Sequence, residues 1–270
     1  MSGARRPFVT GRLPWSLPVF VCLFLLAVVP AGAATSDATP ATEAATPSAP
    51  EDPAMAEVRQ LAESGTPQLA LSTLERRQPP PGEDNTAWMA WERLRITILR
   101  NSGRWSDIVA RLAKLPAGLP QDFVIWARTA RAEALIRGGR AREAIAQLQT
   151  LVWETPLEVS SPDWLRRWRR LILEAYLAAG LAEDARLASL RHFRDYPESG
   201  LEDRLLRARI ALAANRPEEA MERLAEDTRD PRAGMLYLLA QLRSGQRPAR
   251  KVMQAGLRQM RGKWADEKLK

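Results

Sequence analysis

Cysteine is almost absent from this chain of 270 residues. The single cysteine, Cys22, lies inside an apolar run near the N-terminus, so the remainder of the chain has none. This scarcity excludes a disulfide framework and a cysteine nucleophile from the folded part. Stability must therefore come from apolar packing, and a chain of this length with 46% hydrophobic residues can bury a sizeable core.

Histidine is equally scarce, since His192 is the only one in the sequence. A zinc site built from Cys and His is excluded by count. No Gly-x-Ser-x-Gly elbow presents a serine nucleophile. Gly256 and the pair Gly262–Lys263 have the wrong spacing for a phosphate-binding loop, and Trp264 replaces the Ser or Thr that would hold magnesium. We therefore expect no metal, no cofactor and no catalytic residue, and we interpret His192 as a packing or surface residue.

The chain also has no apolar run of the roughly 20 residues that a membrane-spanning helix needs. Its apolar run, Pro18–Val29, follows Arg5, Arg6 and Arg12 and precedes Ala31–Ala33, which has small residues where a signal peptidase reads. This pattern predicts a secretory signal peptide over residues 1–33 and a periplasmic or secreted protein. The alternative is an uncleaved anchor in the inner membrane, with the folded part facing the periplasm.

Two further segments differ from the rest in composition. Residues 34–52 are mostly Ala, Thr, Pro and Ser without large apolar side chains, which predicts a disordered linker. From Arg243 to Lys270 there are nine basic and two acidic residues. A basic end of this kind is a candidate contact surface, and the alternative is a solvated terminal helix.

A short spacing recurs between these segments. A small residue that can end a helix is followed five residues later by a small apolar residue and nine residues later, usually, by Leu, as in Gly139, Ala144 and Leu148. The residues that begin each copy, here called anchors, lie 38, 36, 41 and 35 residues apart. They are Gly65, Gly103, Gly139, Gly180 and Asn215, with Gly245 beginning an atypical last copy. A period of this size predicts stacked helical hairpins.

The sequence accordingly predicts an all-α solenoid of about six antiparallel helix hairpins over residues 53–262, followed by a basic tail at 263–270. Apolar residues recur at helical spacing, and no stretch alternates with period two. Each anchor ends a first helix in a left-handed turn, the small residue lets the two helices approach, and the Leu fills the space between them. The expected helices are 53–64, 67–77, 85–101, 104–115, 120–137, 140–153, 162–179, 182–195, 200–214, 217–227, 231–243 and 248–262.

These positions resemble the tetratricopeptide repeat family. The best copy comprises Ala132, Leu135, Gly139, Ala144, Leu148, Leu151 and Pro156, and weaker copies surround Gly180 and Asn215. The resemblance covers roughly residues 54–262, although Ser189 replaces the expected Leu nine residues after Gly180, and the usual early Trp and Leu are mostly missing. It implies a right-handed superhelix whose concave groove binds protein or polymer, and it implies no chemistry.

The most unusual local string is Trp164-Leu165-Arg166-Arg167-Trp168-Arg169-Arg170. Trp and Arg are enriched in binding hot spots, so this string is a candidate docking face for an acidic protein, a lipid headgroup layer or a wall polymer. The alternative is that the Trp residues pack into the neighbouring hairpin while the Arg residues are solvated or ion-paired. Arg258 and Arg261 in the basic end complete the candidate binding residues.

These observations favour a non-enzymatic exported scaffold or adaptor that binds another envelope protein, with no nucleic-acid partner and with membrane contact only through an uncleaved signal or basic patches. The alternative is a glycan-binding accessory module of cell-wall or exopolysaccharide machinery, distantly like the superhelical part of a soluble lytic transglycosylase. Glu198-Ser199 matches the catalytic pair of those enzymes, but the Arg-Gln that precedes it there is absent here. A glycan binder should expose Trp or Tyr in its groove, whereas a protein adaptor should expose Arg, Asn and mixed apolar residues.

Overall fold

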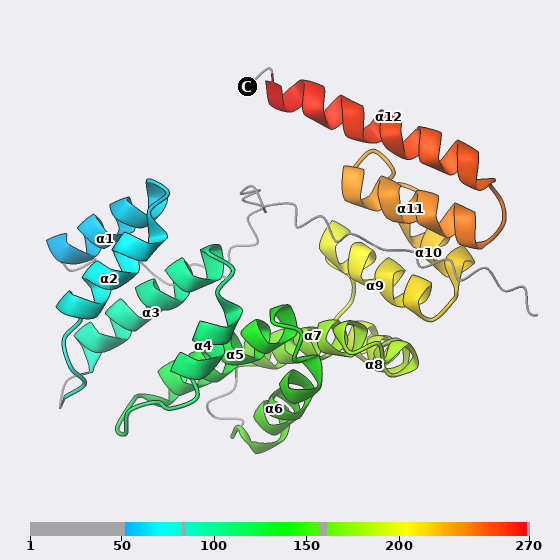
Figure 1. Ribbon diagram of the computed structural model, residues 1–270. Helices are drawn as coiled ribbons and strands as arrows, with labels where there is room; N and C mark the ends of the chain where they lie inside the picture. Colours follow the sequence, from blue (N-terminus) through cyan, green and yellow to red (C-terminus); the bar gives the residue numbers. More distant parts are fainter. Residues whose placement is uncertain (1–51, 83–84, 157–160, 269–270) are drawn as a thin grey trace, which may run out of the picture. The chain divides into compact units, whose positions relative to one another are not determined.

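Helix is the only regular structure along the described chain. A computed structural model describes residues 52–82, 85–156 and 161–268, with the side chains of Met260 and residues 262–268 left out. The predicted signal at 1–33 and the linker up to residue 51 lie outside the described residues. Residues 50–270 form one unit, and its described part has twelve α-helices and no β-strand, which confirms the all-α prediction (Figure 1).

The helices are α1 (Pro53–Glu63), α2 (Pro67–Arg77), α3 (Thr86–Asn101), α4 (Trp105–Arg111), α5 (Gln121–Arg137), α6 (Ala141–Glu154), α7 (Pro162–Ala178), α8 (Ala182–Asp195), α9 (Leu201–Ala213), α10 (Pro217–Leu224), α11 (Pro231–Arg243) and α12 (Ala249–Lys268). Nine of them match the expected ranges to within one residue at each end. Each helix packs against the next along the chain.

Three helix ends differ from the prediction. α4 ends at Arg111 rather than at residue 115. The expected end at Leu115 is unfavourable because a residue that precedes a proline, here Pro116, rarely adopts the helical conformation. α10 ends at Leu224 rather than 227, and Arg204 of α9 holds Asp227 beyond that end with hydrogen bonds of 2.5 and 2.8 Å. α12 continues to Lys268, so the predicted tail is helical over 263–268.

The anchors are confirmed as the turns that end the first helices. All have positive φ: Gly65 (85°), Gly103 (66°), Gly139 (77°), Gly180 (74°), Asn215 (56°) and Gly245 (74°). The N–H of Gly139 donates to Ile136 O at 3.3 Å and that of Arg140 donates to Leu135 O at 2.8 Å. This pair of bonds, a Schellman motif, recurs at the first five anchors. Asn215 occupies the position because Asn is the non-glycine residue that best tolerates this conformation.

The small residue and the Leu that follow each anchor are core residues. Both kinds are fully buried where the pattern is complete: Ala70, Leu74, Ala144, Leu148, Ala220 and Leu224. Where the pattern is degraded, the substitutes are also buried: Ile108, Leu112 and Ser189. Arg250, five residues after Gly245, is exposed, so the last copy departs from the others in structure as well as in sequence.

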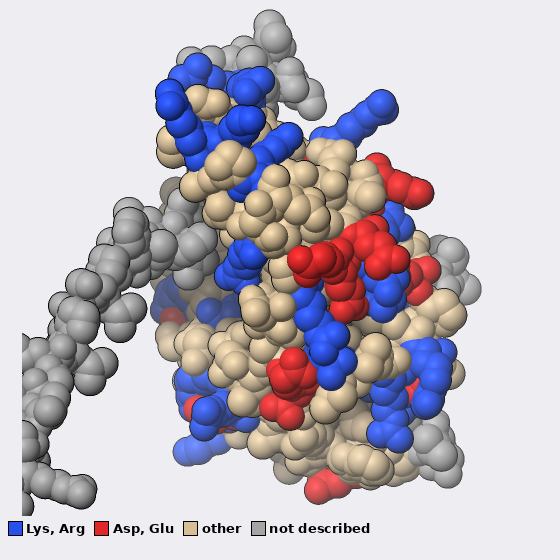
Figure 2. Space-filling view, turned by 90° about the vertical axis from the view of Figure 1, so that its right-hand side faces the viewer, with Lys and Arg blue, Asp and Glu red and all other residues tan. Residues whose placement is uncertain are grey.

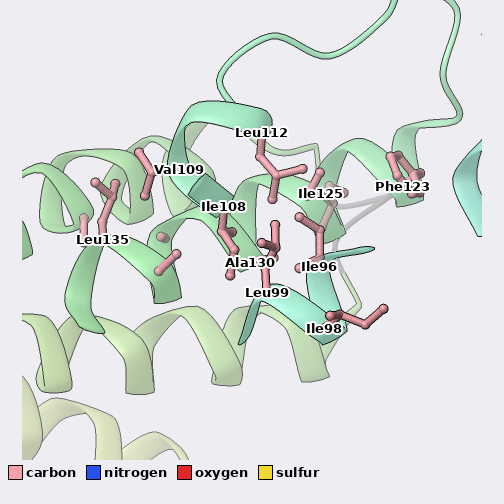
Figure 3. Packing of buried hydrophobic residues seen from close by; sticks show 14 of the residues in the cluster. Ile96, Ile98, Leu99, Ile108, Val109, Leu112, Phe123, Ile125, Ala130 and Leu135 are labelled. Atoms are coloured by element: carbon pink, nitrogen blue, oxygen red, sulfur yellow. The ribbon is translucent and has the colours of Figure 1, made fainter. Parts of the chain in front are cut away.

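The buried apolar residues form clusters that pass from one helix pair to the next. Figure 3 shows Ile108 of α4 and Leu112, directly after α4, lying near Ile96 and Leu99 of α3 and near Ile125 of α5. This cluster extends from α1 to α7, a second links α7, α8 and α9, and a third links α9, α10 and α11. No pair of helices therefore buries its apolar surface alone.

Candidate binding surfaces

The Trp- and Arg-rich string forms the first half of α7. Ser161 caps the helix by accepting a hydrogen bond from the N–H of Trp164 at 3.4 Å, and Pro162 occupies the first helical position. Both features are typical helix starts, because the cap satisfies a free N–H and proline has none to satisfy. The string therefore begins at a well-defined helix end, which fixes the direction of each side chain.

Trp168 is a core residue. It has 0% of its surface exposed, and its indole Nε1 donates a hydrogen bond of 2.8 Å to Thr129 Oγ1 of α5. Thr129 in turn donates to Ile125 O at 2.8 Å, so the buried polar groups are satisfied. Trp164 is half-buried and stacks on Trp168 with ring centroids 6.0 Å apart. Trp168 therefore has no exposed surface that a partner could contact. For this residue the structure agrees with the alternative in which the Trp residues of the string pack against the neighbouring helix pair.

Arg167 joins three first helices through one carboxylate. Its guanidinium lies 2.6 Å from Glu133 of α5 and 5.4 Å from the centre of the Trp164 ring. Glu133 also pairs with Arg100 of α3 at 3.0 Å. A single acid thus bridges two arginines that belong to the preceding and the following helix pair.

Arg166 and Arg170 point to α9, where both approach Asp203. Arg170 forms an ion pair with Asp203, and Arg166 donates to Ser199 Oγ at 3.1 Å. Burial alone would raise the pKa of the Asp203 carboxyl. Hydrogen bonds from the N–H and hydroxyl of Ser199, together with the charge of Arg170, lower that pKa below its ordinary value. Asp203 is therefore a charged, buried link between α7 and α9.

Arg169 pairs with Asp195 of α8 at 2.7 Å and lies 5.9 Å from the Tyr196 ring centre. All four arginines of the string are thus bound to acids of α5, α8 or α9. The string holds neighbouring helices together, and the part that remains open to a partner is the exposed edge of Trp164 and Arg167.

His192 is buried beside this network, in contact with Phe193 and Tyr196. Its Nδ1 finds no hydrogen-bond partner among the residues that the structure describes. Burial is the main reason that the pKa of His192 is lowered from 6.5 to about 4, and the neighbouring arginines lower it further while Asp203 raises it. The imidazole is therefore neutral at physiological pH, in agreement with a packing role.

Sequence reasoning missed a buried ion-pair network between α2, α3 and α4. Glu92 is only 1% exposed, and its carboxylate accepts bonds of 2.8 and 2.9 Å from Arg111 and 3.1 Å from Gln78. The hydrogen bond to Glu92 raises the pKa of Arg111, whereas burial lowers the pKa of Arg95 beside it. An acid between Trp91 and Arg93 gives no signal of burial, because the partner that compensates it lies 19 residues away.

Corresponding positions of five first helices share a similar degree of exposure. Positions 2, 6 and 13 residues before each anchor are exposed or half-buried in α3, α5, α7, α9 and α11. We call this set the first-helix face. It includes the acids Glu133, Glu174 and Glu202, the arginines Arg137, Arg167, Arg209, Arg232 and Arg243, and one tryptophan, Trp126. Arg93 covers the ring of Trp126 at 4.7 Å.

The second candidate surface is the exposed side of α12. Arg258 and Arg261, two of the candidate binding residues, are exposed there. An open hollow of about 460 Å³ lies beside them, lined by Arg247, Lys251, Gln254, Ala255 and Arg258. Figure 2 shows Lys and Arg side chains gathered at the top of the molecule, where α12 lies in Figure 1.

Searches over the described ranges give two further results. No helix between residues 52 and 268 is long and apolar enough to cross a bilayer. No group of three or more His, Cys, Asp or Glu side chains in those ranges is placed to hold a metal ion. Comparison with protein-family models, with curated proteins and with solved structures finds no match to this chain.

Proposed function

We propose that this protein is an exported, non-enzymatic scaffold or adaptor that binds another envelope protein through a helical-repeat surface. In this proposal the helix pairs form a tetratricopeptide-like solenoid of about six hairpins. The recurring Schellman turns, the buried small residue five positions later and the apolar clusters shared between pairs support that architecture.

The observation that carries the proposal is the composition of the first-helix face. From α5 to α11 each first helix presents Arg or Glu at these positions, and Trp126 on this face is covered by Arg93. Glu133 pairs with Arg167 and Glu202 with Arg232, whereas Arg137 and Arg209 have no ion pair within the described part of the chain. Positive and negative side chains at repeating positions suit a protein ligand. Complementary charges on such a ligand would select the correct partner and fix its alignment along the helices. A sugar ring would instead need an open aromatic face.

Trp153 is the observation that favours the glycan-binding alternative. It is 82% exposed near the end of α6, whereas the other tryptophans with described side chains are buried or half-buried. It lies on a second helix, outside the first-helix face. The alternative therefore predicts a ligand site around Trp153, separate from the charged stripe.

Affinity capture from an envelope fraction with the tagged full-length protein tests the adaptor proposal. The informative variant is Arg137→Glu with Arg209→Glu, two exposed arginines of the first-helix face that have no ion pair with a described residue. The matched control is Arg142→Glu with Arg191→Glu, two exposed arginines on the second helices α6 and α8 that are likewise unpaired among the residues described. We expect the same protein to be captured by the parent and the control, and lost with the first-helix variant.

Loss with both variants, or with neither, would contradict a partner that binds this face. A glycan-array signal that disappears in Trp153→Ala, with capture of no protein, would establish the alternative. Export is tested separately by the intact mass of the protein recovered from the envelope. Cleavage after Ala33 removes residues 1–33, and a mass that retains Met1 indicates the anchored alternative.

A further inference from the structure

α12 packs against α11 through one side only. Gly256 is buried at this contact, and a Cβ at this position would lie 3.7 Å from Sδ of Met235. On the same side, Gln259 Nε2 donates to Thr228 O at 3.4 Å. Gly256 and Gln259 therefore lie on the side of α12 that faces α11, and the side chains of Arg250, Lys251, Met253, Leu257, Arg258 and Arg261 on its other sides are exposed.

The solvent side of α12 carries an apolar stripe. Met253 is 61% exposed and Leu257 is 43% exposed, one helical turn apart. Met253 and Leu257 thus give this side of α12 a short exposed apolar strip, and its neighbours decide what the strip can contact.

A basic border lies beside this stripe. Arg250, Lys251, Arg258 and Arg261 are all exposed, and with 3.6 residues per turn they fall within an arc of about 100° next to Met253 and Leu257. None of these four has a carboxylate partner in the described part of the chain. The last ion pairs along the described residues are those of Arg232 on α11. The arginines of α7, by contrast, are bound to acids of the same chain.

We propose that this face of α12 binds the surface of an anionic lipid bilayer. A helix of low mean hydropathy with a Leu and Met stripe beside Lys and Arg lies in the interface of a membrane, its apolar side chains about 5–10 Å deep. The long basic side chains reach the headgroups while their methylene groups cover the apolar stripe. A second copy of the chain is a poorer occupant, because two basic faces repel each other. An acidic protein would satisfy the cations but gives no reason for the apolar stripe.

This inference does not depend on the proposed function. The face lies on the second helix of the last pair, whereas the adaptor proposal concerns the first-helix face. An adaptor that loses its protein partner can retain lipid binding, and the reverse also holds. The two proposals therefore fail independently.

Co-sedimentation of the full-length protein with vesicles tests the inference. One set of vesicles is pure phosphatidylcholine, and the other contains one third phosphatidylglycerol. The basic variant is Arg250→Gln with Arg258→Gln, and its matched control is Arg142→Gln with Arg191→Gln. Each cation near an anionic surface contributes about fivefold, so we expect partitioning to anionic vesicles to fall about 30-fold in the basic variant and to stay unchanged in the control.

The apolar stripe has its own variant, Met253→Gln with Leu257→Gln. Its control is Leu187→Gln with Leu190→Gln on α8, whose side chains are 58% and 50% exposed. We expect a loss on the order of tenfold for the α12 variant, since both half-exposed apolar side chains would leave the lipid interface. Raising the salt from about 0.1 to about 1 M shortens the screening length from about 10 to about 3 Å and should reproduce the basic variant.

Every other outcome overturns the inference. Equal binding of all variants to both vesicle types would place lipid binding in the apolar N-terminal run that they share. Equal competition by soluble polyglutamate and by anionic vesicles, with no effect of the apolar variant, would indicate an acidic protein. Self-association without vesicles that is lost in the Met253 and Leu257 variant would indicate a second copy.

Discussion

Replacing Trp168 by Phe should destabilise the protein by about 2–4 kcal/mol without changing what it binds. The indole is fully buried between α5 and α7, and its N–H donates to Thr129 Oγ1 at 2.8 Å. Removing one partner of a buried hydrogen bond costs about 1–3 kcal/mol. The smaller ring adds a cavity term of about 1 kcal/mol, which depends on how far the surrounding helices relax.

Urea denaturation of the purified protein measures this change, with the slope m checked to confirm that the unfolding transition is unaltered. Trp153→Phe is the matched control, because Trp153 is exposed and surface substitutions stay within about 0.5 kcal/mol. Thr129→Val combined with Trp168→Phe should show a coupling free energy of about 0.5–3 kcal/mol. A loss below about 0.5 kcal/mol in Trp168→Phe would refute the placement of Trp168 in the core.

Three further predictions concern the repeat and the buried histidine. Gly139→Ala should lower stability by about 1–2 kcal/mol, because its φ of 77° is strained for alanine even though no atom crowds the added Cβ. Gly82→Ala, where φ is not positive, should be near neutral, and thermal denaturation compares the two variants. Ala144 is fully buried where α5 and α6 approach, so Ala144→Leu should overpack this contact and lower stability by about 1–3 kcal/mol. Ala146 is exposed, so Ala146→Leu should leave stability unchanged. Equal melting temperatures of the two variants would contradict the assignment of that helix pair. The unfolded chain protonates His192 near pH 6.5 and the folded chain near pH 4. The free energy of unfolding should therefore be highest above pH about 6.5 and fall by about 2–3 kcal/mol as the pH is lowered to about 4. Urea denaturation in a series of buffers measures this fall, which should be absent in His192→Gln.

Each anchor and the residues that follow it could be predicted because the interactions are local. A left-handed residue ends a helix through bonds to carbonyls three and five residues earlier, so Gly139 or Asn215 and its neighbours carry the whole signal. The burial of Ala144 and Leu148 follows from the same turn, since these residues begin the returning helix. Helix type and most helix ends could be predicted for this reason, whereas the ends of α4 and α10 depend on contacts outside the helix.

The candidate binding residues could be predicted only in part. The string Trp164–Arg170 stood out by composition, but its role depends on acids that are 26–34 residues away in the chain. Composition could not distinguish Trp168, which is buried, from Trp153, which is exposed. The basic character of α12 was visible in the sequence, and the structure added that Met253 and Leu257 lie exposed beside it.

By itself, then, the sequence determined the helical class, the period of the repeat and the turn that ends each first helix, because these depend on spacings of a few residues. Tertiary structure decided which charges are compensated and which remain free. Glu92 is held by Arg111, and Asp203 is held by Arg170 on another helix pair, whereas Arg258 pairs with no acid whose side chain the structure describes. The physical reason is that ion pairing depends on distances in space, and those distances exist only after neighbouring helices have packed.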